Sequence, residues 1–226
     1  MRMKQSRTLR RKSGRQKRES ARPRAATRLN IIEAAERLFG AFGIHGVSLR
    51  KFGLEAGSAH KSAVAYHFKN LKGLVRAIFE HRLPVLEARR REMLVAATEG
   101  GRTPNVRALL DVLFVPLTEQ VDHRGVHSYA AFLVGLSQFH QFVERRKLAK
   151  SAPVINQAVG LLAETLTHLE PRQFRRRFAA VNDMVLNTIT RREDDVEKAS
   201  LDDLLDMATA ALQADFGGQA QRAQTR

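Results

Sequence analysis

The sequence predicts an all-α protein, and three observations support this fold class. Apolar residues recur at three- and four-residue intervals in one segment after another, which is the spacing of one helix face. No segment shows the period-two alternation of a half-buried strand. Gly, Pro or short polar stretches separate the periodic segments, as expected where one helix ends and the next begins. At 226 residues with 43% hydrophobic composition, the chain can form a small module and a larger helical domain.

The first two predicted helices form the start of the small module. The first begins with Thr27 as its N-cap and ends at Gly43, and its apolar face comprises Ile31, Ala34, Ala35, Leu38, Phe39 and Phe42. The second begins with Ser48 as its N-cap and ends at Gly57, which can adopt the left-handed conformation that terminates helices. One face of this second helix carries Leu49, Phe52 and Ala56.

A third short helix is crowded with small, basic and hydrogen-bonding side chains. It follows a turn that contains Gly57, and Ala63 and Val64 are expected to face inward. The side chains that can reach outward are Lys61, Ser62, Tyr66 and His67. Two helices joined by a short Gly-containing turn form a helix-turn-helix, whose second helix enters a DNA major groove. Residues 27–83 are therefore predicted to be a DNA-binding module.

The rest of the chain is predicted to be a second helical domain over residues 84–216. Residues 71–97 are amphipathic, and Pro84 is predicted to end or kink one helix and begin another. Gly100 and Gly101 then break the run. Further amphipathic helices are predicted at 104–121, 126–147, 153–169, 171–192 and 200–216, before a flexible tail at 217–226.

A basic arm precedes the predicted module. Residues 1–26 hold eleven Lys or Arg and the single acid Glu19, so they carry +10 of the net charge of +16. With many charges and few apolar residues, we expect this arm to be disordered in isolation. It can follow phosphates or enter a minor groove beside the module. The alternatives are a solvated tail that adds only non-specific affinity, and attraction to anionic lipid.

Five short motifs occur in order between residues 27 and 83. They are Ile32-Glu33-Ala34-Ala35-Glu36-Arg37-Leu38-Phe39 with Gly43, then Val47-Ser48-Leu49-Arg50, Glu55-Ala56-Gly57, Tyr66-His67-Phe68-Lys69 and Leu74. The ordered set resembles the N-terminal signature of the TetR family of transcriptional regulators. Beyond residue 95 the resemblance is weak. It implies a helix-turn-helix domain followed by a domain that binds an effector and dimerises.

The resemblance also implies which residues contact DNA. By this resemblance, Lys61, Ser62 and the methyl group of Ala63 contact the edges of the bases. The residues expected to contact the DNA backbone are Thr27, Ser48, Arg50, Tyr66, His67, Lys69 and Lys72. The chain departs from the family at Ala65, where many members have a Tyr, and at Leu71, where many have a Lys that Lys72 can replace. The alternatives are core packing for Tyr66, and a capping or core role for His67.

Two apolar surfaces are expected in the second domain. The broad face of the 126–147 helix suggests a ligand pocket lined by Tyr129, Phe132, Leu136, Phe139 and His140. Two stripes on the last helices match the pair that forms the dimer interface in the family, and their residues are Phe174, Phe178, Val181, Val185, Ile189, Leu201, Leu205 and Leu212. In each case the alternative is that the residues belong to the core of one chain.

Catalysis and membrane insertion find no support in the sequence. The eight histidines show no metal-ligand spacing, no Ser/His/Asp grouping is present, and the absence of cysteine excludes disulfides and thiolate sites. We therefore expect no enzyme, cofactor or metal site. No segment approaches the roughly 20 apolar residues of a membrane span, and no signal-peptide core follows the basic start.

The sequence therefore leads to one main functional hypothesis. It is a cytoplasmic, nucleoid-associated TetR-like repressor that binds a palindromic double-stranded DNA operator as a homodimer and is released by a small-molecule effector. One alternative is a ligand-independent DNA-binding or architectural protein. The other is a protein that binds a membrane surface through its basic arm.

Overall fold

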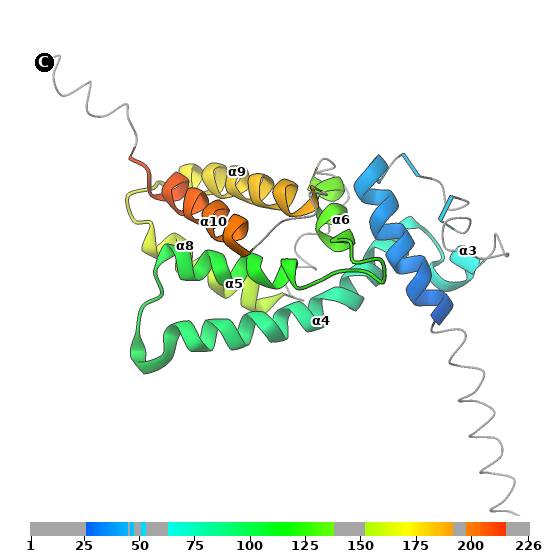
Figure 1. Cartoon of the computed structure of the whole chain (residues 1–226), viewed down its shortest axis with the longest axis horizontal. Helices are drawn as coiled ribbons and strands as arrows, with labels where there is room; N and C mark the ends of the chain where they lie inside the picture. The colour runs from blue at the N-terminus through cyan, green and yellow to red at the C-terminus, as the bar shows by residue number, and fades with distance from the viewer. Residues whose placement is uncertain are drawn as a thin grey trace, which may run out of the picture.

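The structure is a computed structural model that describes residues 26–44, 46–47, 51–52, 63–137, 152–191 and 198–215. Within these ranges the chain consists of helices and their connections, with no strand (Figure 1). The prediction of an all-α fold is confirmed for this part of the chain. Residues 1–25 of the predicted basic arm and the predicted tail at 217–226 lie outside the described residues.

The helices agree closely with the amphipathic segments of the sequence. An N-terminal helix covers residues 26–42, and residues 51–52 are also helical. The remaining elements are α3 (Ala63–Phe68), α4 (Leu71–Thr98), the short 3-10 helix η1 (Glu99–Gly101), α5 (Val106–Thr118), α6 (Ser128–Ser137), α8 (Pro153–Thr165), α9 (Pro171–Thr190) and α10 (Lys198–Gln213). Of the helix predicted at 126–147, only the part up to Ser137 is described.

Helix α4 corrects the prediction that Pro84 separates two helices. It continues through Pro84 as one helix of 28 residues. Proline removes one backbone hydrogen bond, but Pro84 and Glu80 are both exposed, so water can bind the carbonyl left without its partner. The predicted end at Gly100 and Gly101 is confirmed, because both glycines have positive φ, at 70° and 73°. The predicted domain boundary at 83/84 therefore falls inside one continuous helix.

One hydrophobic core extends from the N-terminal helix to α10. Helices α4, α5 and α8 pack against one another, α10 packs on α5 and α9, and α9 also packs on α6 (Figure 1). The N-terminal helix contributes Ile31, Ala35, Leu38 and Phe39 to this core, as its periodicity predicts. Phe42 does not follow the prediction. It is 53% exposed, and the Lys51 ammonium lies 3.4 Å from its ring centroid.

The two apolar stripes predicted to form a dimer interface lie in the core of a single chain. Helices α9 and α10 run antiparallel, and the Arg177 side chain near the start of α9 donates to the Leu212 carbonyl at the end of α10. Their apolar faces point toward each other and toward α6 and α5. The buried members are Phe174, Val181, Val185, Ile189, Leu201, Leu205 and Leu212, and Phe178 is partly buried against them. A second copy cannot contact the seven buried side chains, because they are already covered within one chain, so their assignment to a dimer interface is corrected.

Candidate nucleic-acid interface

Helix α3 is a short helix at one end of the molecule, and Phe68 is its buried residue among the side chains that the structure describes. The Phe68 side chain is 5% exposed, and the Arg28 guanidinium of the N-terminal helix lies 5.5 Å from its ring centroid. Tyr66 is 69% exposed, which contradicts the alternative that it packs in the core. His67 is half-buried, and its ring lies edge-on to that of Tyr66 at 5.2 Å between centroids. Helix α3 therefore presents Tyr66 to solvent while Phe68 anchors it.

A tight corner joins α3 to α4. Lys69 has a φ of 61°, the left-handed conformation that non-glycine residues rarely adopt. The next residue, Asn70, caps α4, since its side-chain oxygen accepts from the Gly73 N–H at 2.9 Å. A Cβ added at Gly73 would lie 2.0 Å from the Phe68 carbonyl oxygen. Only glycine therefore permits α3 to lie this close to the first turn of α4.

Replacing Gly73 with alanine is expected to displace α3 and lower the melting temperature. The added Cβ meets backbone, which cannot move without opening the corner. Gly160→Ala is the matched control, because nothing lies within 4 Å of a Cβ at that helical position. The control should be neutral, or stabilise the chain by roughly 0.5–1 kcal/mol. Thermal unfolding followed by circular dichroism measures both variants, and equal melting temperatures would contradict a constrained corner.

The structure brings together only part of the predicted DNA-contacting set. Tyr66, His67, Lys69 and Lys72 lie along α3 and the corner that follows, and Thr27 lies in the first turn of the N-terminal helix, which reaches α3 through Arg28 (Figure 1). Lys69 and Lys72 are exposed. The described residues include Ala63 only as the first residue of α3, and they do not include Ser48, Arg50, Lys61 or Ser62.

Sequence reasoning missed Arg76 as a further basic residue on this side. It lies one helical turn after Lys72 on α4 and is exposed. Its spacing of four residues from Lys72 is a signal that could have identified it. With Lys69 and Lys72 it forms a basic edge that extends from the corner along α4. Such an edge can neutralise phosphates.

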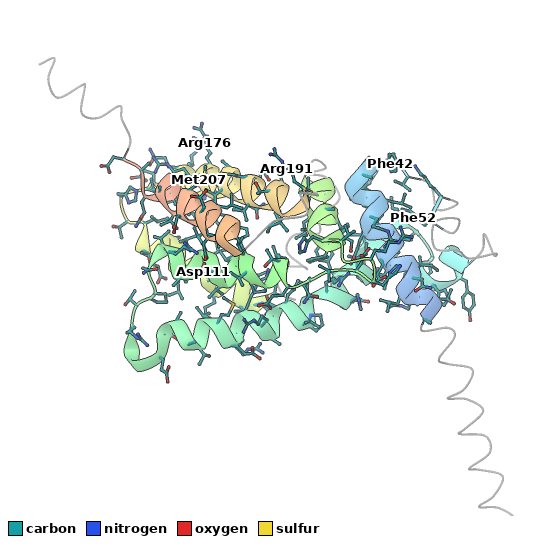
Figure 2. All side chains as sticks on the ribbon, viewed as in Figure 1. Phe42, Phe52, Asp111, Arg176, Arg191 and Met207 are labelled. Carbon is teal, nitrogen blue, oxygen red and sulfur yellow. The ribbon has the colours of Figure 1, made fainter. Side chains whose placement is uncertain are left out.

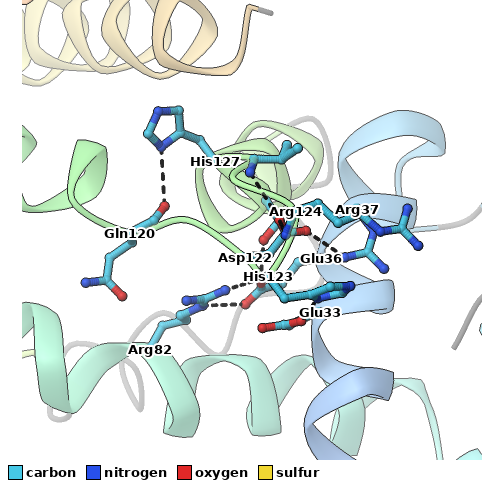
Figure 3. Close-up of polar contacts among 11 residues, drawn as sticks. Glu33, Glu36, Arg37, Arg82, Gln120, Asp122, His123, Arg124 and His127 are labelled. Atoms are coloured by element: carbon cyan, nitrogen blue, oxygen red, sulfur yellow. Dashed lines mark hydrogen bonds and ion pairs between the residues drawn. The ribbon is translucent and has the colours of Figure 1, made fainter.

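A buried polar network ties the N-terminal helix to α4 and α6 (Figure 3). The Arg82 guanidinium donates to both carboxylate oxygens of Glu36, each at 2.8 Å, and the Ser128 hydroxyl donates to Glu36 at 2.6 Å. Glu36 and Ser128 are 0% exposed and Arg82 is 6% exposed. Burial alone would lower the pKa of Arg82, but its hydrogen bond with Glu36 and that carboxylate's charge raise it. Arg82 therefore stays protonated, and its guanidinium binds the Glu36 carboxylate in a bidentate arrangement.

The loop between α5 and α6 makes a second set of contacts with the same helix. Arg37 donates to Asp122 at 2.6 Å, and His123 contacts Glu33 (Figure 3). Asp122 also accepts the backbone N–H groups of Arg124 and Val126, at 2.8 and 3.1 Å. Burial alone would raise the pKa of Asp122, but Arg37 and these N–H groups hold it below its usual value. Asp122 is thus an ionised side chain that both shapes the loop and attaches it to the N-terminal helix.

Two glycines allow the N-terminal helix and α6 to cross at close range. A Cβ at Gly135 would lie 2.2 Å from the Phe39 carbonyl oxygen, and one at Gly40 would lie 2.6 Å from the Ala131 Cβ. The polar network and this crossing leave little freedom between the N-terminal helix and α6. A shift of α6 is therefore expected to move the N-terminal helix.

Three of the five predicted ligand-pocket residues are buried side chains of α6. Phe132 is 0% exposed, and its ring lies 5.8 Å from that of Phe39 and 5.3 Å from that of Phe79. It therefore belongs to the core, as the alternative reading held. Tyr129 and Leu136 are also buried, at 2% and 7% exposure. Phe139 and His140 lie outside the described residues.

Comparison of the chain with protein-family models and with curated proteins finds no match. Within the described ranges, no helix combines the length and apolar character needed to cross a bilayer.

Proposed function

We propose that this chain is a TetR-like transcriptional regulator that binds a palindromic DNA operator as a homodimer and is released by a small-molecule effector. The observation that carries the proposal is the way α3 is fixed in place and the side chains that it exposes. It is a short helix fixed by Phe68 and by the corner at Gly73, with Tyr66 exposed and with Lys69 and Lys72 following it. A rigidly placed helix with outward polar and basic side chains suits a major groove flanked by phosphates.

The contacts between α6 and the N-terminal helix favour an effector-responsive regulator over a ligand-independent DNA-binding protein. The Glu36–Arg82–Ser128 contacts and the glycine crossing join α6 to the predicted DNA-binding module. A ligand that shifts α6 can therefore change the position of that module through packed, hydrogen-bonded groups. An architectural protein has no need of such a connection.

Two lysine variants test the DNA-binding proposal. Lys61→Ala is expected to cost about 1–3 kcal/mol of binding and to relax preference at one base pair per half-site. Lys72→Ala should weaken binding to all sequences alike and reduce the salt slope by about 1 per subunit. Selection from a random duplex library followed by titration at several salt concentrations measures both effects. Arg102→Ala, at an exposed position just after η1, is the control and should bind like the unmodified chain. Failure to select any motif would contradict the proposal.

The proposed homodimer requires a surface other than the two buried stripes, and the outer face of α9 and α10 offers one. Its centre is small or apolar, with exposed Ala179, Ala180, Met207 and Ala210. Arg175 and Arg176 lie toward the start of α9, and Asp203 lies toward the start of α10. Figure 2 labels Arg176 and Met207 of this face. Since the helices are antiparallel, Arg175 and Arg176 lie at one end of this face, and Asp203 lies at the other end, where α9 ends at the exposed Arg191. A two-fold axis through the centre would bring Arg175 and Arg176 of one copy toward Asp203 of the other.

Introducing a charge at the centre of this face is expected to separate the dimer without unfolding the chain. Ala180→Glu places a carboxylate on an exposed position, where two copies would meet near the axis. Light scattering with analytical ultracentrifugation measures the mass, and the variant should sediment as a monomer with an unchanged melting temperature. Ala163→Glu, at an exposed position on α8, is the control and should remain dimeric. If the Ala180→Glu variant remains dimeric, the dimer interface does not lie on this face.

A further inference from the structure

An incompletely satisfied ion pair lies buried in the middle of α4. Four buried side-chain atoms in the described part of the chain have no hydrogen-bond partner, and three of them are Arg90 Nε, Arg90 Nη1 and Glu87 Oε1. Arg90 is 3% exposed and Glu87 is 6% exposed. Buried polar groups in folded proteins almost always have partners, so a cluster of three without them requires an explanation.

Contacts with two different helices hold the pair in place. Arg90 Nη2 donates to the Leu113 carbonyl of α5 at 3.0 Å, and Glu87 accepts the Val154 N–H in the first turn of α8 at 2.7 Å. The two facing atoms, Arg90 Nη1 and Glu87 Oε1, are 3.6 Å apart, which exceeds hydrogen-bond length. Since α5 and α8 each hold one member, the pair presents two donors and one acceptor side by side. Arg90 Nε has no hydrogen-bond partner, and Arg90 Nη1 and Glu87 Oε1 contact each other only at ion-pair distance.

The charge balance of the pair restricts what can bind there. Burial lowers the pKa of Arg90, but a guanidinium stays protonated in proteins. As an ion pair, Arg90 and Glu87 together carry no net charge. Burial also raises the pKa of Tyr129, whose hydroxyl interacts with Arg90, and that hydroxyl is therefore neutral. An anionic ligand would add an unbalanced charge at a buried site, which is strongly unfavourable. A neutral group that both donates and accepts a hydrogen bond is suited to the three free atoms.

We propose that Arg90 and Glu87 form the polar end of a binding site for a small neutral carboxamide. Its carbonyl oxygen accepts from Arg90, and its N–H donates to Glu87. Leu86 and Leu94 lie one turn to either side of Arg90 on the same face of α4 and are both buried, so the rest of the ligand is apolar. This inference rests on the proposed function, in which the site would hold the effector.

Matched compounds test this chemistry directly. The probes are octanamide with octanoate and methyl octanoate, and benzamide with benzoate and methyl benzoate. Thermal unfolding of the full chain should show that at least one amide raises the melting temperature with increasing concentration. Isothermal titration calorimetry should give that amide a Kd at least about tenfold lower than those of its carboxylate and ester. No response to either amide, or equal responses within each set, would show that Arg90 and Glu87 form only a structural ion pair.

Variants connect the response to the two residues. Arg90→Met alone would leave Glu87 buried without its cation, so the informative variant is the double substitution Glu87→Gln with Arg90→Met. It retains an acceptor for the Val154 N–H and removes both charges, and it should melt at or above the temperature of the unmodified chain while losing the preference for the amide. Arg91→Met, at the exposed neighbouring position, should retain that preference. A preference for the amide that persists in the double variant would overturn the assignment.

These measurements contain no DNA, so the two proposals can fail separately. A chain that binds the amide but selects no DNA motif contradicts the proposed function and leaves the site intact. A chain that selects a motif but ignores both amides contradicts the site alone.

Discussion

Replacing Arg82 with methionine is expected to lower the free energy of unfolding by about 3–5 kcal/mol, because it leaves the Glu36 carboxylate buried without its cation. Glu36 is 0% exposed and receives both hydrogen bonds of the Arg82 fork. The hydroxyl of Ser128 would be the only partner of Glu36 to remain in the network. Urea unfolding followed by circular dichroism measures the change. The expected loss is a large fraction of the total stability of a typical domain, about 5–15 kcal/mol.

Two control variants separate the buried charge from the loss of a side chain. Glu36→Leu combined with Arg82→Met removes both charges, and it should recover most of the stability that the single variant loses. Arg89→Met removes an exposed pair in which Arg89 and Glu119 lie 3.0 Å apart on the surface, and it should change stability little. If Arg82→Met matches Arg89→Met, the network contributes little to folding, and its role in joining α6 to the N-terminal helix must be abandoned.

Introducing glutamate at Val185 is expected to prevent stable folding. Val185 is 0% exposed on the inner face of α9, so the variant places an unpaired carboxylate in the core. The cost should exceed about 4 kcal/mol, which is among the largest effects of single substitutions. The loss should be smaller in acid, because burial raises the pKa of the introduced carboxyl group and its neutral form costs less. Thermal unfolding at neutral and acidic pH measures both effects.

Ala180→Glu is the matched control for this experiment. It introduces the same side chain on the same helix, but at an exposed position on the outer face. The two variants should therefore fail in different ways. Val185→Glu should not fold, whereas Ala180→Glu should fold but not dimerise. Helix content that is unchanged in Val185→Glu would show that the inner stripe of α9 is free after all, and would return it to the dimer interface.

The sequence by itself determined the elements of the fold because their signals are local. The spacing of Ile31, Leu38 and Phe39 predicts an amphipathic helix whatever surrounds it, and all three are buried. Gly43 has a φ of 66° and its N–H donates to the Phe39 carbonyl, so the predicted end of that helix is also confirmed. The exposure of Tyr66 agrees with the outward position that its helical pattern predicts.

Only the tertiary structure decided what covers each apolar face. Periodicity states which side of a helix is apolar, but it does not identify the partner. The stripes of α9 and α10 could therefore not be assigned to core or interface from the sequence, and neither could Phe132. The same limit explains why the exposure of Phe42 was not predicted. Phe42 continues the apolar spacing of its helix, but no part of the described chain covers it.

The contacts that join the two parts of the molecule were also decided only in three dimensions. Glu36 and Arg82 are 46 residues apart, and no local pattern relates them before the helices pack. Gly40 and Gly135 lie in otherwise ordinary helical sequence, and their lack of a side chain matters only because the two helices cross there. Local propensities specify helices through neighbours in the chain. Long-range pairs depend on the packing that follows, so their residues acquire a role only in the folded molecule.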